Sequence, residues 1–208
     1  MSAILNALGD SELAGAYQEE KKRLKVIRDA RQKKQSLDKE VVAWTAVQAL
    51  QPKALAELSS EDYLIYSLYT FVPPVRADYC GMVFTSKPGD DLSTKNYILT
   101  SEGDWFFVFN DYKTQKTYGQ VKNIIPDDLK EILKTHEADG SILNLSENAL
   151  TKRVISVFKK LGVQTSITGL RHSFITHFLS KKRSILEKEV IAQMMMHSTG
   201  LQERYDIL

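Results

Sequence analysis

The sequence of 208 residues has one cysteine, Cys80, and no apolar run that approaches the length of a membrane span. One cysteine excludes an internal disulfide and leaves a zinc cluster short of thiolates, which suits a reducing compartment. A bilayer-spanning helix needs about 20 apolar residues. The opening segment has two acidic residues where a secretory signal would be apolar. We therefore expect an untargeted, soluble, intracellular chain with no membrane partner.

Acidic residues are missing from one long stretch. Residues 151–183 contain eight basic residues and no Asp or Glu, although the formal net charge of the whole chain is only +2. A second block, residues 21–34, has eight basic residues and one acidic residue. The second block alone predicts no more than a solvated helix face. The acid-free block favours a polyanion, and in particular nucleic acid, as the partner.

What is present is an ordinary globular composition, with 43% hydrophobic and 26% charged residues. The length suits one core with a short appendage. Apolar spacing and end signals predict helices at 10–35, 37–58, 63–72, 126–133, 146–161, 170–179 and 186–196. Three β-branched and aromatic runs, 96–100, 105–110 and 120–125, predict a small antiparallel sheet. We expect a mainly α fold with a three-stranded antiparallel β-sheet.

Four motifs carry the chemistry. They are VPPVRADY with Arg76, NDYKTQKTYG with Lys113, TGLRHSFITHFL with Arg171, and MMMHSTGLQERYDIL with His197 and Tyr205. In this order they resemble the catalytic domain of the tyrosine recombinases, or phage-type integrases. The first motif is particularly similar to integrases of large DNA viruses and mobile elements. The resemblance covers residues 38–208 and leaves residues 1–37 as a basic helical arm or linker.

The resemblance implies a site-specific DNA recombinase or integrase that works through a covalent 3′-phosphotyrosine intermediate, without metal or cofactor. It implies that Tyr205 is the nucleophile, that Lys113 protonates the leaving 5′ oxygen and that His197 donates to a phosphate oxygen. Double-stranded DNA would be the substrate and a homotetramer the assembly on it.

Physical reasoning gives the arginines the same role without the family. Two guanidinium groups can clamp the non-bridging oxygens of one phosphate in a planar, bidentate way. Arg76 and Arg171 fit that role, so they must converge in space. A phenol attacking phosphorus conserves the bond energy as an ester, which permits rejoining without ATP.

Several assignments stay open at this point. Lys116 is a second candidate for the acid beside Lys113. Asp78 is either the orienting carboxylate of Arg76 or a helix-start acid. His172 and His177 are five residues apart, which does not align them on one helix face, so packing is favoured over a metal site.

Three departures from the family pattern stand out. Thr168 occupies the place of a usual histidine and reads as a helix N-cap, the spacing from His197 to Tyr205 is one residue short, and only three residues follow Tyr205. These features keep three alternatives open: a catalytically impaired DNA-binding remnant, a type IB topoisomerase-like relaxation activity, and a helical module that binds RNA or acidic protein.

Overall fold

The computed structural model describes residues 15–27 and 42–198, and the chain divides into two units, Met1–Glu40 and Val41–Leu208. In the first unit, residues 15–27 form a helix, inside the range 10–35 that the sequence predicts to be helical. The rest of that range up to residue 35 lies outside the described residues. Within the described ranges, none of the helices has the length and apolar character needed to cross a membrane.

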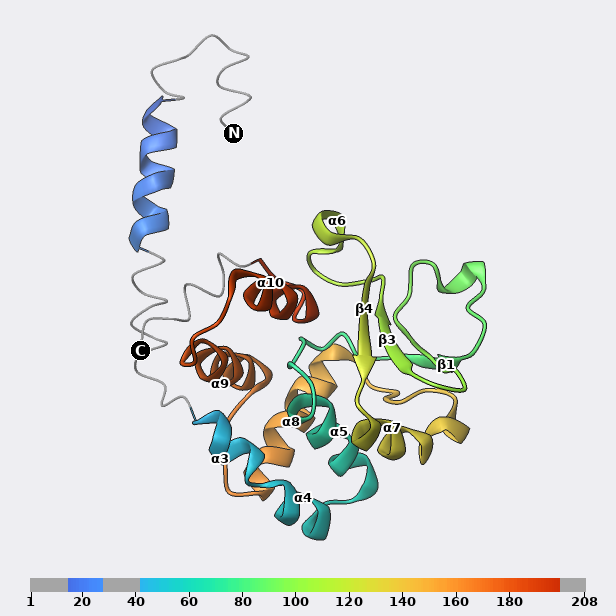
Figure 1. Cartoon of the computed structure of the whole chain (residues 1–208). Helices are drawn as coiled ribbons and strands as arrows, with labels where there is room; N and C mark the ends of the chain where they lie inside the picture. Colours follow the sequence, from blue (N-terminus) through green and yellow to red (C-terminus); the bar gives the residue numbers. More distant parts are fainter. Residues whose placement is uncertain (1–14, 28–41, 199–208) are drawn as a thin grey trace. The chain divides into compact units, whose positions relative to one another are not determined.

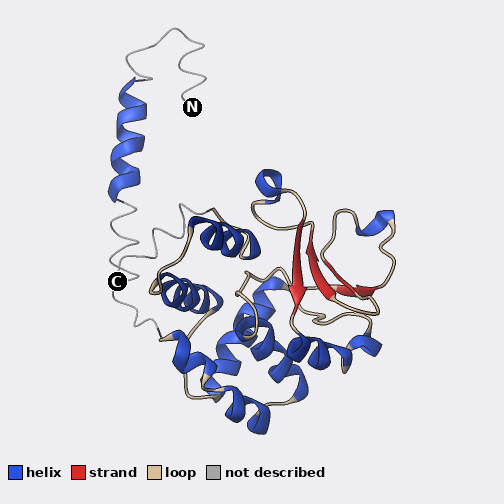
Figure 2. Cartoon of the chain, viewed as in Figure 1, coloured by secondary structure: helices blue, strands red, loops and turns tan. Residues whose placement is uncertain are grey.

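Helices dominate the second unit (Figure 2). Their bounds are α3 Trp44–Gln48, α4 Gln51–Glu57, α5 Ser60–Thr70, α6 Gln115–Tyr118, α7 Asp127–Lys134, α8 Glu147–Lys160, α9 Ile167–Leu179 and α10 Ile185–Met194, with short 3₁₀ turns at Asp90–Leu92 and Glu137–Asp139. Serine caps begin α5, α8 and α10, where the side chains of Ser59, Ser146 and Ser184 accept hydrogen bonds from backbone amides. The capping box predicted at Ser184 and Glu187 is confirmed.

The sheet corrects the sequence prediction. It has four strands in the order β1 Val83–Thr85, β2 Tyr97–Leu99, β3 Trp105–Phe109 and β4 Val121–Ile125. The three predicted strands correspond to β2, β3 and β4, which pair antiparallel. The additional strand β1 pairs parallel to β2, so the sheet is mixed. At three residues, β1 is too short to show the alternation by which a strand is recognised.

The main core lies between the helices and one face of the sheet. Figure 1 shows α3, α5, α8, α9 and α10 on the same side of β4. From Leu64 to Thr70, α5 is buried all round. The ring of Tyr79 lies 5.2 Å from that of Phe107 and 5.6 Å from that of Tyr69, which joins the sheet to α5. This packing holds the turn between α5 and Tyr79 in a fixed place.

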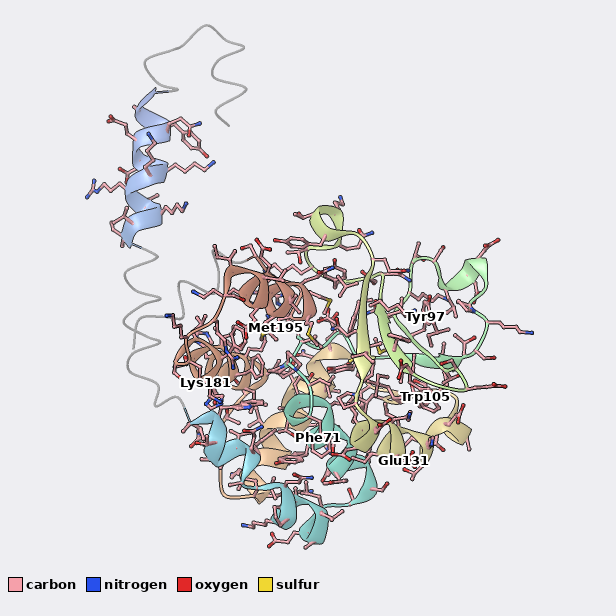
Figure 3. All side chains as sticks on the ribbon, viewed as in Figure 1. Phe71, Tyr97, Trp105, Glu131, Lys181 and Met195 are labelled. Carbon is pink, nitrogen blue, oxygen red and sulfur yellow. The ribbon has the colours of Figure 1, made fainter. Side chains whose placement is uncertain are left out.

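Two details of the C-terminal helices bear on the site. The N-cap of α9 is Ser166, whose side chain accepts from the amide of Gly169, so the prediction of Thr168 as the cap is wrong. Thr168 lies in the first turn and is exposed. The methionine run after α10 belongs to the core as predicted, since Met195 and Met196 are fully buried (Figure 3).

Candidate active site

The turn after α5 presents Arg76. Pro73 and Pro74 follow the end of α5, where a proline cannot continue the helix. The backbone N–H of Arg76 donates to Oδ2 of Asp78 at 3.0 Å, and its carbonyl accepts from the hydroxyl of Tyr69 at 2.8 Å. The main chain of Arg76 is thus held from both sides, while its side chain comes from a half-buried residue.

Arg171 joins this turn to the end of α10. The residue is 5% exposed on α9. Its Nη1 donates to the carbonyl of Pro74 at 2.7 Å and its Nη2 to the carbonyl of Met195 at 3.3 Å. One guanidinium therefore bridges segments that lie 97 and 24 residues away in the chain. The fork geometry of arginine suits this double donation.

His197 sits directly after a Schellman-type end of α10. The amide of Met196 donates to Gln193 and that of His197 to Ala192, at 2.9 and 3.0 Å. Met196 takes the left-handed position with φ 54°, which normally favours glycine. A positive φ at a bulky residue persists only where the surrounding structure imposes it.

The imidazole of His197 is buried among positive charges. The residue is 2% exposed, and neither ring nitrogen has a hydrogen-bond partner among the described residues. Burial, then the charge of Arg171, then that of Arg76, lowers the pKa of His197 to about 4. The ring is therefore neutral at neutral pH, and its polar atoms are left for a group that the protein itself does not supply.

Asp78 faces the same charges. Burial raises the pKa of its carboxyl group, an effect opposed by the Arg76 amide and by the charges of Arg76 and Arg171. Asp78 follows Arg76 in a turn outside any helix, so the reading of Asp78 as a helix-start acid is wrong. Arg76, Asp78, Arg171 and His197, here called the cationic cluster, are brought together from three segments of the chain.

Lys113 and Lys116 are both exposed on the connection between β3 and β4. Lys116 lies in the short helix α6, which interrupts the polar loop expected there. Among the described residues, neither lysine makes a hydrogen bond or ion pair, so the choice between them stays open. Tyr205 lies outside the described residues.

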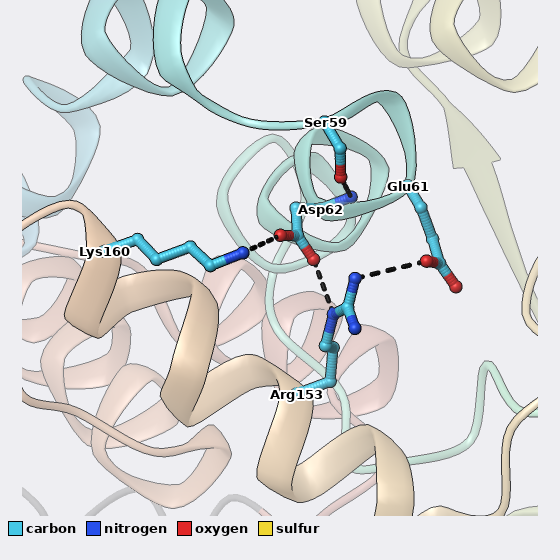
Figure 4. A network of polar contacts seen from close by, with 5 residues as sticks. All are labelled: Ser59, Glu61, Asp62, Arg153 and Lys160. Atoms are coloured by element: carbon cyan, nitrogen blue, oxygen red, sulfur yellow. Dashed lines mark hydrogen bonds and ion pairs between the residues drawn. The ribbon is translucent and has the colours of Figure 1, made fainter.

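The acid-free block does not stay acid-free in space. From α8, the Nε of Arg153 and the Nζ of Lys160 each lie 2.6 Å from an oxygen of Asp62 on α5 (Figure 4). Arg153 also contacts Glu61 at 3.2 Å. These four residues form the Asp62 cluster. Although burial raises the pKa of Asp62, hydrogen bonds from Lys160 and Arg153 lower it further than burial raises it.

Other cations of the block have different roles. Arg183 pairs with Glu187 at 2.9 Å. The remaining lysines of the block are exposed: Lys152, Lys159, Lys181 and Lys182. The sequence argument for a polyanion therefore applies to about half of the block's charges.

His172 and His177 are half-buried on α9, and burial lowers the pKa of each. In the part of the chain that the structure describes, no three His, Cys, Asp or Glu residues are grouped as a metal site would require.

Sequence reasoning missed the polar residues that hold the site together, Asn96, Thr114 and Asn123. Each bonds to the backbone of a segment carrying a candidate residue: Asp78, Met196 and Met194, at 3.0, 2.9 and 2.9 Å. No local signal marks them, because a polar residue in a loop or on a strand edge ordinarily faces water.

Comparisons with known proteins address the fold. A scan against models of known families finds no match, and a search of curated proteins finds none either. Among solved structures, the crystal structure of XerA recombinase matches with a TM-score of 0.56 at 15% identity. The match covers 82% of this chain and 59% of that chain, so it spans less than two thirds of the recombinase. The fold of this chain is therefore similar to that of a tyrosine recombinase.

Proposed function

We propose that this chain is a site-specific DNA recombinase that breaks and rejoins strands through a 3′-phosphotyrosine intermediate. The observation that carries the proposal is the cationic cluster. In a fold similar to XerA recombinase, two guanidinium groups distant in sequence surround a neutral, unpartnered histidine. Such a cluster is complementary to a phosphodiester, which carries one negative charge and two non-bridging oxygens.

In the proposed reaction, the phenol of Tyr205 loses its proton to solvent and the phenolate oxygen bonds to phosphorus. The bond from phosphorus to the 5′ oxygen breaks, and that oxygen takes a proton from Lys113. Arg76 and Arg171 neutralise the charge that builds on the non-bridging oxygens. His197, being neutral, still has one N–H to donate. Rejoining is the reverse reaction with a 5′ hydroxyl as nucleophile.

Double-stranded DNA is the proposed substrate, and a homotetramer on DNA is the proposed assembly. The exposed lysines of the acid-free block and of the β3–β4 connection supply phosphate contacts that do not read sequence. Binding should therefore weaken steeply as salt rises.

A second candidate is a DNA-binding protein that has lost strand cleavage. The observation that favours it is Thr168, exposed in the first turn of α9, two residues after the N-cap Ser166. A threonine hydroxyl is a poor proton acceptor at the place where the family has a histidine. This candidate keeps DNA binding and predicts no covalent adduct.

The test uses a pool of nicked duplexes with a randomised recognition segment, from which a cleaved fragment diffuses away and traps the intermediate. Adducts that resist SDS are recovered and sequenced, and the enriched duplex becomes the substrate for later measurements. We expect adducts with the wild-type chain and none with Tyr205→Phe.

An adduct that persists in Tyr205→Phe would refute the nucleophile assignment. Binding without any adduct would favour the DNA-binding remnant. Relaxation of supercoiled plasmid by monomeric protein, without exchange between sites, would favour a type IB topoisomerase-like activity.

A further inference from the structure

The connection between β3 and β4, residues 110–120, is tied to both other parts of the cationic cluster. At its start, Asn96 links it to the turn that carries Arg76. Further along, the hydroxyl of Thr114 donates to the carbonyl of Met196 at 2.9 Å, directly before His197. Lys113 lies between these two tethers.

The first tether uses every hydrogen-bonding site of one amide side chain. Nδ2 of Asn96 donates to the carbonyls of Asp78 and Asp111 at 3.0 and 2.8 Å. Its Oδ1 accepts from the amides of Asn110 and Asp111 at 2.9 and 2.8 Å. Since an amide has two donors and two acceptor lone pairs, Asn96 is fully satisfied. It fixes the start of the connection relative to Arg76.

The second tether belongs to a row of three. The carbonyls of Met194, Met195 and Met196 accept from three different elements. The donors are Asn123 on β4, Arg171 on α9 and Thr114 on the connection. Carbonyls at the end of a helix lack intrahelical partners, and here tertiary donors satisfy them. The left-handed Met196 is therefore held by contacts that include Thr114.

We propose that Thr114 is a positioning residue for Lys113, which its hydroxyl holds against the segment that precedes His197. Adjacent Cα atoms are about 3.8 Å apart, so a shift at Thr114 moves Lys113 as well. The inference rests on the proposed function and deepens it. Protonation of the leaving oxygen is coupled to the packing of the segment that leads toward the nucleophile.

Three variants test this coupling in single-turnover cleavage of the selected duplex. Thr114→Val removes the hydroxyl at nearly constant shape, and we expect cleavage to slow about tenfold, the effect of one lost hydrogen bond. Thr114→Ser keeps the hydroxyl and should stay within about twofold of wild type by the same reasoning. The matched control is Thr117→Val, at an exposed threonine of the same connection.

A modified leaving group separates positioning from structure. With sulfur in place of the bridging 5′ oxygen, the departing thiolate needs no proton. If Thr114 acts through Lys113, wild type and Thr114→Val should cleave this substrate at equal rates. A defect of Thr114→Val that persists on the sulfur substrate would overturn the proposal.

Amide hydrogen exchange tests the tether without any activity. Thr114→Val should speed exchange in residues 111–118 and 195–197 together, and Thr117→Val should not affect 195–197. Unchanged exchange at 195–197 would overturn the tether even if the wild type cleaves DNA. Faster exchange in a chain that never cleaves would support the tether and reject the recombinase.

Discussion

The Asp62 cluster and the cationic cluster both bring charged side chains into the protein, and they differ in how the charges are matched. In the Asp62 cluster, each oxygen of a carboxylate whose side chain is 1% exposed meets one cation at 2.6 Å. In the cationic cluster, two guanidinium groups surround one carboxyl group and a histidine whose ring has no hydrogen-bond partner among the described residues.

The difference separates a structural site from a reactive one. A matched buried pair is satisfied by the protein alone, so it asks for no ligand. Concentrated charges of one sign beside a desolvated histidine cost folding free energy, and such perturbed groups gather at functional sites. Both clusters use arginines of the same sequence block, and only their partners in space distinguish Arg153 from Arg171.

The largest effect should come from Arg171→Lys. A lysine is a point charge and cannot serve two carbonyls and a phosphate as a planar fork does. We expect single-turnover cleavage to fall by about 10²- to 10³-fold. The matched control is Arg153→Lys in the Asp62 cluster, which should cleave at the wild-type rate. Equal losses in both variants would erase the distinction between the clusters.

The converse change is Asp62→Asn, measured by urea denaturation. Breaking a buried ion pair should lower the free energy of unfolding by about 3 kcal/mol, because Arg153 and Lys160 lose the charge they face. Cleavage by the folded fraction should be unchanged. Because the folded pKa of Asp62 is lowered, its contribution is present above the unfolded value of 3.8 and is lost as pH falls through the folded pKa. A stability within error of wild type would contradict the structural role.

The cationic cluster should make stability depend on pH in a different range. The folded protein keeps His197 neutral with a pKa of about 4, whereas the unfolded chain binds a proton near 6.5. Stability is therefore complete above pH 6.5 and declines as pH falls toward 4. Between pH 7 and pH 5 we expect a loss of about 2 kcal/mol from this group.

Urea denaturation of wild type and His197→Gln at both pH values isolates that contribution, since His172 and His177 are common to both proteins. The pH-dependent loss should be smaller in His197→Gln by the stated amount. Identical pH dependence would mean that His197 is already protonated in the folded protein.

The smallest effect is stabilisation by inorganic phosphate. An anion that binds the cationic cluster should raise the free energy of unfolding by about 1 kcal/mol at several times its Kd. Arg76→Gln should remove this gain, while Lys160→Met in the Asp62 cluster should keep it. A phosphate effect that survives Arg76→Gln would place the anion elsewhere.

Local elements were predictable because their causes are local. The serine caps of α5, α8 and α10, the stripe of α8 and the strands β2 to β4 follow from residues only a few positions apart. Strand β1 was missed because three residues carry no period, and Ser166 rather than Thr168 begins α9. In each case a short signal competed with a neighbouring one of similar strength.

The site was predictable only in part. The motifs named Arg76, Arg171 and His197, and the structure brings these three together. Lys113 could not be separated from Lys116, since both are exposed. The tethers from Asn96 and Thr114 carry no sequence signature, because what distinguishes them is the backbone carbonyl that each one meets.

The sequence by itself determined the helices, most of the strands and the order of the motifs, since caps, apolar periods and turn residues act over a few positions. Only the tertiary structure decided which charges are matched. Arg153 finds Asp62 across 91 residues, and Arg171 finds the Arg76 turn across 97. A composition count cannot see such pairs, because the field at each arginine is set by whichever groups folding places beside it.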